Sequence, residues 1–239
     1  MKCLILASGF GTRLYPLTRD TPKALIQYNG KPLLAHMVDR IPRDIDILLV
    51  TNRKFEADFL RWQETIDRKV QIAVEDVWIE KDKKGALGSL TFGIEQGNIK
   101  EDLLLLASDD YFEFDLSQFI AAYSGKDALV AVHDIGDKKR ASQFGVVEVQ
   151  DGKIVKCEEK PVHPRSSLIG IACYLLPPRL FPVLSRYRRD HPEIDQLGHF
   201  ITYLVECDTV DAYVFTELWL DTAAIISSSG QAETPGESK

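Results

Sequence analysis

Cysteine and histidine are scarce in this chain, and neither is spaced as in a zinc site. The sequence of 239 residues contains 4 cysteines without a Cys-x-x-Cys pair and 5 histidines without ligand-like spacing. Each cysteine lies within or beside an apolar run, so we expect small, buried, reduced thiols in place of disulfides. Zinc sites and disulfide scaffolds are therefore not expected, and any bound metal should have oxygen ligands.

Long hydrophobic runs and an excess of positive charge are also missing. No apolar run reaches the ~18 residues that a membrane-spanning helix needs, and the first residues lack the basic and then apolar pattern of a secretion signal. A formal net charge of −7 opposes binding to the phosphate backbone of a nucleic acid. We expect a cytoplasmic protein with no membrane or nucleic-acid partner. No internal repeat is found, which argues against an appended β-helix.

Apolar strand-like runs alternate with helical patterns through the first half of the chain. They cover residues 2–7, 32–41, 46–51, 54–66, 70–75, 87–96 and 103–108. This alternation predicts a Rossmann-like, doubly wound α/β fold with a mixed, mainly parallel sheet and helices on both faces. In such sheets, ligands bind at the carboxyl ends of the strands. With 45% hydrophobic residues, the chain can form one domain with a substantial core.

The second half of the chain is richer in β-structure. Strands are expected over residues 128–133, 145–149, 154–159, 168–176, 211–215 and 217–221, and helices over 178–186, 195–206 and 222–228. Asp151-Gly152 is a strong hairpin signal. We predict a single domain over residues 1–229, with halves at 1–127 and 128–229. Residues 230–239 are rich in Gly, Ser, Pro and Glu and are predicted to form a flexible tail.

The most informative segment is the glycine-rich stretch after the first predicted strand. Ser8-Gly-Phe-Gly-Thr-Arg-Leu14 follows the apolar run 2–7, and Lys23 comes soon after. Glycines let successive backbone N–H groups turn toward an anion, and Arg13 and Lys23 add positive charge, so the segment suits a polyphosphate. It does not fit the dinucleotide fingerprint, which needs a glycine in place of Leu14, or a P-loop, which needs Gly-Lys-Ser/Thr.

The stretch from Leu4 to Thr18, with Pro22-Lys23 after it, resembles the signature of the sugar-1-phosphate nucleotidylyltransferases, also called nucleotide-sugar pyrophosphorylases. Ser8 is a small departure from that signature. Further motifs recur in family order: Gly85-Ala-Leu-Gly-Ser-Leu90, Ser108-Asp109-Asp110, Phe144-Gly-Val-Val147, Glu158-Glu-Lys-Pro161 and Trp219-Leu-Asp-Thr222. The chain is identified as a member over residues 1–229. The resemblance implies a glycosyltransferase-A-like fold, with a nucleotide-binding half at 1–127 and a β-rich sugar-binding half at 128–229.

The resemblance also implies roles for individual residues. Arg13 should lie against the triphosphate and stabilise the transition state, Lys23 should support it, and Lys160 should bind the phosphate of the sugar substrate. The nucleotide should be contacted by Ala7, Ser8, Gly9, Gly11, Thr12, Gly85 and Gly88. The sugar ring should be contacted by Gly145, Glu159, Gly170 and Asp195. Ile169 replaces the threonine that usually precedes the glycine beside the sugar, which leaves sugar selectivity open.

Two carboxylates at strand ends match the metal-binding aspartates of the family. Asp109 follows the apolar strand 103–107, Asp221 follows Trp219-Leu220, and Asp110 is a second candidate. Joining a sugar phosphate to a nucleoside triphosphate brings two polyanions together, and Mg²⁺ prefers the carboxylate and phosphate oxygens present there. We therefore expect Mg²⁺ as the cofactor, held by Asp109 and Asp221.

Several features remain open at this stage. The lysines at 81, 83 and 84 belong to no motif and are interpreted as part of a solvated loop over residues 80–84. Our expected activity is transfer of a nucleotidyl group from dTTP or UTP to glucose 1-phosphate, releasing pyrophosphate. The alternatives are a cytidylyltransferase acting on a sugar, inositol or choline phosphate, and a non-catalytic subunit that senses nucleotide sugars. Self-association into a homo-oligomer is also left open.

Overall fold

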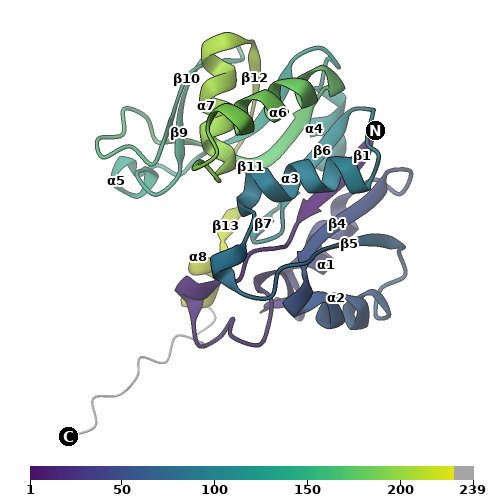
Figure 1. The fold of residues 1–239 in the computed structure, drawn as a ribbon. Coiled ribbons are helices and arrows are strands. Elements are labelled where there is room, and N and C mark those ends of the chain that lie inside the picture. The colour runs from purple at the N-terminus through teal and green to yellow at the C-terminus, as the bar shows by residue number, and fades with distance from the viewer. Residues whose placement is uncertain (229–239) are drawn as a thin grey trace, which may run out of the picture.

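A nine-stranded mixed sheet organises the computed structural model, which describes residues 1–228 (Figure 1). The strand order is β5-β4-β1-β6-β11-β8-β12-β10-β9. The strands are β1 (Lys2–Leu6), β4 (Asp46–Asn52), β5 (Val70–Glu75), β6 (Leu103–Ala107), β8 (Ala128–Asp134), β9 (Gly145–Gln150), β10 (Lys153–Glu159), β11 (Leu168–Leu176) and β12 (Val210–Phe215). The predicted α/β fold is confirmed, with most strand boundaries within a residue of those expected.

The first half of the sheet is parallel and buried on both faces. β1 pairs in parallel with both β4 and β6, and β4 pairs in parallel with β5. Alternate residues of β1 belong to two different hydrophobic clusters: Cys3 and Ile5 on one face, and Leu4 and Leu6 on the other. A strand that is apolar at successive positions must be covered on both sides, so residues 3–7 require two layers of helices.

Helices supply these two layers. α1 (Leu33–Arg40), α2 (Glu56–Gln63) and α4 (Leu116–Ala121) pack their apolar residues into the cluster that holds Cys3 and Ile5. α3 (Gly85–Gln96), α6 (Phe181–Asp190) and α7 (Leu197–Cys207) cover the opposite face. Gly93 of α3 permits close packing on the sheet, because an added Cβ would lie 2.7 Å from Leu4 Cδ1. No helix within residues 1–228 is both long and apolar enough to cross a lipid bilayer.

The second half of the sheet contains most of the antiparallel pairing. β11 runs antiparallel to β6, β8 and β9, and β9 and β10 form the predicted hairpin, with Asp151 and Gly152 at φ 49° and 74°. β12 is inserted between β8 and β10 and is parallel to β8. The expected helices 178–186 and 195–206 correspond to α6 and α7, each beginning later than predicted. The short helix α5 (Lys138–Ala141) precedes β9.

A small second sheet pairs a strand near the end of the described chain with a strand from the middle of the sequence. β7 (Asp110–Phe112) pairs antiparallel with β13 (Trp219–Asp221), and α8 (Thr222–Ser228) follows directly. The pairing places Asp221 opposite Asp110. A further short hairpin joins β2 (Gln27–Tyr28) to β3 (Lys31–Pro32). The sequence did not indicate β2, β3, β7 or α4, which are two to six residues long.

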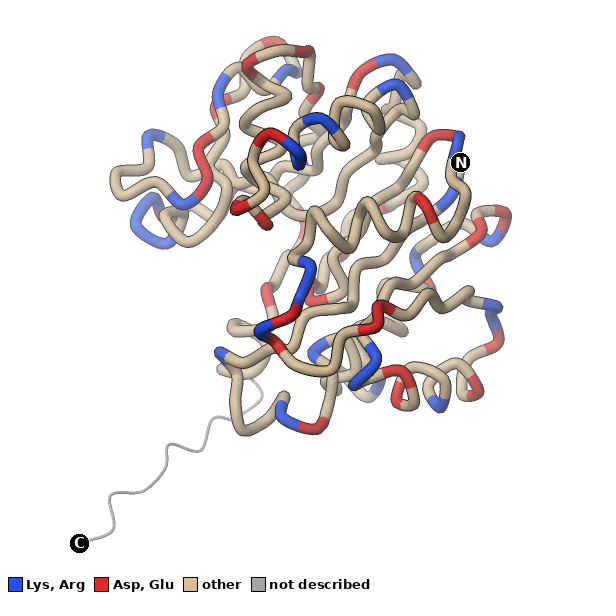
Figure 2. Tube along the Cα trace, in the orientation of Figure 1, with Lys and Arg blue, Asp and Glu red and all other residues tan. Residues whose placement is uncertain are grey.

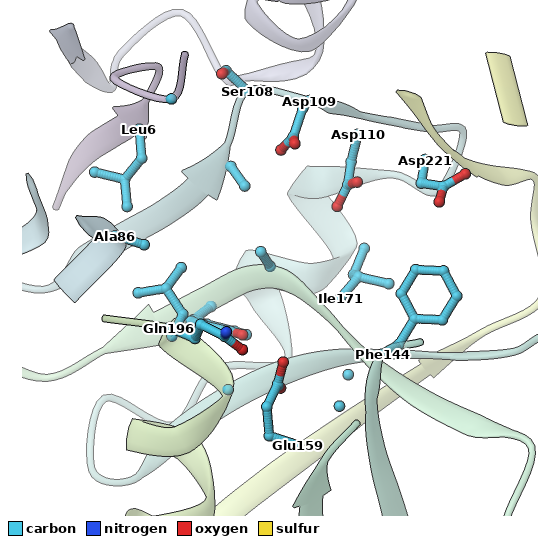
Figure 3. Close-up of a pocket in the computed structure, with 18 of the residues that line it drawn as sticks. Leu6, Ala86, Ser108, Asp109, Asp110, Phe144, Glu159, Ile171, Gln196 and Asp221 are labelled. Carbon is cyan, nitrogen blue, oxygen red and sulfur yellow. The ribbon is translucent and has the colours of Figure 1, made fainter. Parts of the chain in front are cut away.

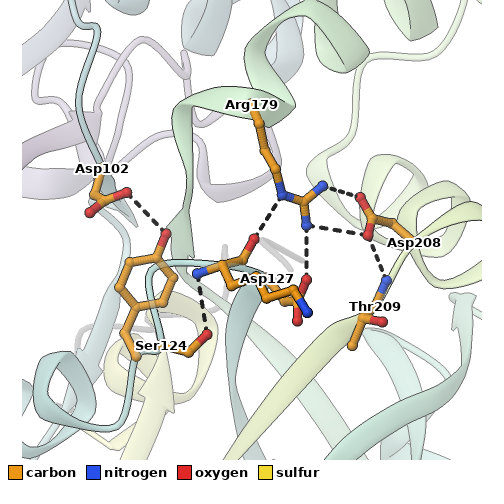
Figure 4. A network of polar contacts seen from close by, with 8 residues as sticks. Asp102, Ser124, Asp127, Arg179, Asp208 and Thr209 are labelled. Atoms are coloured by element: carbon orange, nitrogen blue, oxygen red, sulfur yellow. Dashed lines mark hydrogen bonds and ion pairs between the residues drawn. The ribbon is translucent and has the colours of Figure 1, made fainter.

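The side chain of Arg179 connects its own segment to residues 126–127 and to Asp208 (Figure 4). Its guanidinium donates to the Lys126 carbonyl at 2.7 Å, to Asp127 at 2.9 Å and to both carboxylate oxygens of Asp208. Hydrogen bonding from Arg179 holds the pKa of the Asp208 carboxyl below its usual value. The network fixes the residues just before β8 to the end of α7.

One cysteine does not follow the expectation of burial. Cys3, Cys157 and Cys173 are free and buried, whereas Cys207 is free and exposed. Burial raises the pKa of the Cys157 thiol to about 11. Cys207 is the last residue of α7, where the helix leaves the apolar layer, so an apolar sequence context alone did not predict its exposure. The predicted tail 230–239 lies outside the described residues.

Candidate active site

A large cleft opens along the carboxyl ends of the first strands and continues over β9, β10 and β11 (Figure 3). Its volume is about 940 Å³. Residues from motifs far apart in the sequence line it, which follows from the sheet order, because β1, β6 and β11 are neighbours. The predicted residues found in the lining are Ala7, Ser8, Gly9, Arg13, Lys23, Gly85, Asp109, Gly145, Glu159, Lys160, Gly170, Asp195 and Asp221.

Hydrogen bonds fix the start of the glycine-rich loop to its neighbours. Ala7 N donates to the Val50 carbonyl of β4 at 2.8 Å, which extends the pairing of β1 by one residue. The Asn52 side chain donates to the Ser8 carbonyl at 2.8 Å. Ser8 Oγ lies 2.6 Å from Ser89 Oγ of α3. The serine that departs from the family signature thus connects the loop to α3 through its own side chain.

Gly11 allows the rest of the loop to fold tightly over Lys23. It adopts φ 66°, and an added Cβ would lie 2.9 Å from both Lys23 Cγ and Thr18 Cβ. Thr18 Oγ1 donates to the Gly11 carbonyl at 2.6 Å. Gly11 and Thr12 were predicted to contact the nucleotide, but neither is among the residues that line the cleft. Thr12 Oγ1 instead donates to Glu80 at 3.0 Å.

Three aspartates gather where β6 and the small sheet meet, and Figure 3 shows Asp110 between Asp109 and Asp221. Lys23 Nζ donates to Asp109 Oδ2 at 2.9 Å. Asp221 Oδ1 accepts from Ala224 N at 2.9 Å, at the start of α8. Thr222 Oγ1 donates to the Asp109 carbonyl at 2.6 Å, which fastens the two aspartate-bearing segments together. The pairing of β7 with β13 is what brings Asp109, Asp110 and Asp221 to one place.

Asp110 is the most perturbed of these carboxyls. Burial raises its pKa well above the usual value, and the negative charges of Asp109 and Asp221 raise it further, while Lys23 acts in the opposite direction. A buried carboxyl group beside two further carboxylates is an electrostatic setting in which a bound cation is stabilising.

The donor set fits a hard divalent cation. Carboxylate oxygens are the protein ligands that Mg²⁺ prefers, and it commonly uses only one or two of them together with substrate phosphates and water. Within residues 1–228, no three or more His, Cys, Asp or Glu side chains are arranged to hold a metal ion by themselves. A site completed by substrate phosphate oxygens satisfies both observations.

Strand register brings the predicted sugar-contacting residues together at the other end of the cleft. Gly145 of β9 lies opposite Glu159 of β10 and opposite Gly170 of β11. Gly145 leaves space beside the Glu159 carboxylate, since an added Cβ there would come within 3.1 Å of Glu159 Oε2. Gly198 of α7 approaches even more closely, since its Cβ would lie 1.8 Å from Glu159 Oε2.

Lys160 follows directly at the end of β10 in an unusual backbone conformation. Its φ of 48° is in the left-handed region, and its backbone N–H donates to the Phe144 carbonyl at 3.0 Å. Its Nζ lies 3.3 Å from Glu159 Oε1 and donates to Gln196 Oε1 at 3.2 Å. Gln196, which the sequence analysis did not single out, therefore helps to position the lysine predicted to bind the sugar phosphate.

Gly85 and Asp195 join the two halves of the molecule across the cleft. Gly85 has φ 70°, and an added Cβ would lie 2.2 Å from Asp195 Cβ. Leu87 N, in the first turn of α3, donates to the Asp195 carbonyl at 3.1 Å. Gly88 is placed differently: it is buried inside α3 near Lys84 and Arg188 and is not among the residues that line the cleft.

Two cations near the cleft were missed by the sequence analysis. Lys83, interpreted as part of a solvated loop, is exposed but lines the cleft. Arg140 of α5 places Nη2 4.0 Å from Asp221 Oδ1. Lys83 stands only two residues before Gly85, and this proximity was the one available signal. Nothing in the local sequence indicates that Arg140 approaches Asp221, because the two come from elements far apart in the sequence, the helix α5 and the strand β13.

The comparisons with known proteins agree with this geometry. The model of the nucleotidyl transferase family matches residues 2–228. The chain therefore belongs to the nucleotidyl transferase family, as its motifs predicted.

The relatives are named for several sugars and bases. The chain is 30% identical over 189 residues to the UTP–glucose-1-phosphate uridylyltransferase AglF of Haloferax volcanii, covering 76% of this chain and 74% of that protein. It is 26% identical over 225 residues to the bifunctional protein GlmU of Methanocaldococcus jannaschii, covering 92% of this chain but 51% of GlmU. The chain thus spans about half the length of that relative.

Solved structures share the fold. A structure described as a putative glucose-1-phosphate thymidylyltransferase from Bacillus anthracis superposes with a TM-score of 0.84 at 23% identity, covering 100% of this chain and 98% of that one. A UDP-glucose pyrophosphorylase complexed with UDP-glucose gives a TM-score of 0.78 at 22% identity, covering 96% of this chain and 97% of that one. These similarities establish the architecture.

Proposed function

We propose that this protein transfers a nucleotidyl group from a nucleoside triphosphate to a sugar 1-phosphate, giving a nucleotide sugar and pyrophosphate. The observation that carries the proposal is the convergence of Arg13, Lys23 and the aspartate pair Asp109 and Asp221 in one cleft with Glu159 and Lys160. The cleft offers cations for two phosphate groups and a carboxylate for sugar hydroxyls, and they lie at opposite ends of a single space.

Each group has a defined task in this proposal. Arg13, which makes no ion pair within residues 1–228, is free to contact the triphosphate and the charge that develops at the α-phosphorus. Lys23 holds Asp109 and adds positive charge beside it. Lys160 receives the phosphate of the acceptor, and Glu159 accepts hydrogen bonds from its hydroxyls. Alignment of the two phosphates is the main contribution of the cleft.

Mg²⁺ is the proposed cofactor, with Asp109 and Asp221 as its protein ligands and Asp110 between them in Figure 3. When bound, it would neutralise charge on the entering and leaving phosphate oxygens. Glucose 1-phosphate with dTTP or UTP is the proposed substrate pair. The name of the Haloferax relative and the description of the Bacillus structure support this pair. We also propose the division into a nucleotide-binding half, 1–127, and a sugar-binding half, 128–229.

The test is a matrix of five nucleoside triphosphates against several phosphomonoesters, including glucose 1-phosphate, inositol phosphate and phosphocholine, with pyrophosphate release measured in Mg²⁺. We expect turnover with a sugar 1-phosphate and its loss on chelation of the metal. Asp109→Asn and Asp221→Asn should abolish turnover, and Asp127→Asn, which lies outside the cleft, is the control. Turnover only with phosphocholine or inositol phosphate and CTP would replace the proposed acceptor. Nucleotide-sugar binding without any turnover would identify a sensing subunit.

A further inference from the structure

The side chains that line the cleft include more carboxylates than cations, so each cationic side chain matters for binding an anionic substrate. Its lining contains five carboxylates, from Asp109, Asp110, Glu159, Asp195 and Asp221, and four cationic side chains, from Arg13, Lys23, Lys83 and Lys160. A substrate that carries a triphosphate therefore meets a cleft whose formal charge is already negative by one. The metal compensates at one end only, so the remaining phosphates depend on side chains that are not already paired.

Two of the four cations are engaged with carboxylates. Lys23 Nζ lies 2.9 Å from Asp109, and Lys160 Nζ lies 3.3 Å from Glu159. Arg13 has no such partner within residues 1–228, and Lys83 has a loose one, with Nζ 3.6 Å from Glu80 Oε1. An exposed pair at this distance contributes at most about 1 kcal/mol. Arg13 and Lys83 are therefore the cations that can bind a new anion with the smallest loss of existing interactions.

Glu80 links the two loops that border the nucleotide end of the cleft. Its Oε1 accepts from Thr12 Oγ1 at 3.0 Å, and the same atom faces Lys83 Nζ. Thr12 belongs to the glycine-rich loop, whereas Lys83 stands in the charged segment that leads into α3 (Figure 2). A carboxylate oxygen thus occupies the space between a hydroxyl donor and an ammonium donor. A phosphate oxygen offers both donors the same chemistry with more negative charge.

We propose that Lys83 is a further triphosphate-binding residue and that Glu80 holds its place before the nucleotide binds. When a nucleoside triphosphate enters, a phosphate oxygen takes the position of Glu80 Oε1 between Thr12 and Lys83, and the carboxylate turns toward solvent. Binding therefore exchanges one set of hydrogen bonds for another, and no covalent bond changes. This inference rests on the proposed function and extends it to a segment without a family motif.

Direct nucleotide binding tests the inference separately from turnover. Isothermal titration of the full chain with UTP and with dTTP, each with Mg²⁺, gives Kd for the wild type, for Lys83→Met and for Lys81→Met. Lys81 belongs to the same segment, is exposed and does not line the cleft, so it is the matched control. We expect Kd to rise about tenfold for Lys83→Met, the weakening typical of one lost charge-assisted contact, and to change less than twofold for Lys81→Met.

Substitution of Glu80 should change Kd in the opposite direction. Glu80→Gln removes the competing charge, so Kd should fall severalfold, whereas Asp82→Asn removes the same charge two residues away, has no side-chain partner among the described residues and should change Kd little. Equal Kd values for Lys83→Met and Lys81→Met would overturn the inference and leave the proposed function standing. Absence of triphosphate binding by the wild type would overturn both. Because both side chains are largely exposed, far-UV circular dichroism should confirm unchanged folding.

Discussion

Replacing Gly85 by alanine separates backbone strain from the contact that joins the two halves of the cleft. Gly85 has φ 70°, and its missing Cβ would lie 2.2 Å from Asp195 Cβ. Gly136 has a nearly identical φ of 67° with no heavy atom within 4 Å of the Cβ position. Both alanines incur the strain of the left-handed region, about 1–2 kcal/mol, but only Gly85→Ala also forces apart two packed segments, for about 1–3 kcal/mol more.

Urea unfolding of the two variants measures the difference. We expect the free energy of unfolding to fall by about 1–2 kcal/mol for Gly136→Ala and by about 2–5 kcal/mol for Gly85→Ala, with unchanged m-values. Because displacement of Asp195 disturbs the Leu87–Asp195 hydrogen bond at the start of α3, Gly85→Ala should also weaken triphosphate binding, and Gly136→Ala should not. Equal losses of stability in both variants would show that Asp195 yields freely and that this contact does not hold the halves together.

Three further predictions concern single side chains. Arg13→Ala should lower kcat of the proposed reaction by about a hundredfold with a smaller change in KM for the triphosphate, and an unchanged kcat would remove its role in the transition state. Gln196→Leu should raise KM for the acceptor severalfold, because Lys160 loses the oxygen that positions it, while Gln196→Glu should restore that contact; equal KM values would refute the positioning role. Arg179→Met should destabilise the fold by up to about 1 kcal/mol at neutral pH, a value limited by solvent exposure of the guanidinium. Arg179 lowers the pKa of Asp208 in the folded protein below the value of 3.8 that we take for the unfolded chain. The variant should therefore show its full loss of stability above pH 3.8, and this loss should shrink as the pH falls through the pKa of Asp208 in the folded protein. A loss independent of pH in urea unfolding would show that packing, not the ion pair, accounts for it.

The sequence predicted the regular architecture because local patterns encode it. Runs such as 3–7 and 103–107 are apolar at every position, as expected of a parallel strand covered on both faces, and Asp151-Gly152 marks a turn by its backbone preferences. Short elements were missed, because two or three residues of β2 or β7 carry too little periodicity to be recognised. The partner of β7, the strand β13, also lies in a distant part of the chain.

The same distinction between local pattern and distant contact applies to the residues of the candidate site. Residues with a motif, such as Arg13 and Asp221, were found from the chain alone, because their chemistry and spacing are local. Lys83 and Gln196 were not, since what distinguishes them is a neighbour brought close by folding: Glu80 held by Thr12 for one, and Lys160 at the end of β10 for the other.

The amino-acid sequence by itself determined the fold class, the family and the motif residues that line the cleft, because these depend on composition, periodicity and the spacing of residues within short segments. Only the tertiary structure decided which carboxylates and cations face one another. The pairing of β7 with β13 assembles three aspartates from segments more than a hundred residues apart, and the burial and charge repulsion that raise the pKa of Asp110 exist only after that pairing forms. Electrostatic energy depends on distance in space, and the order of residues along the chain does not specify it.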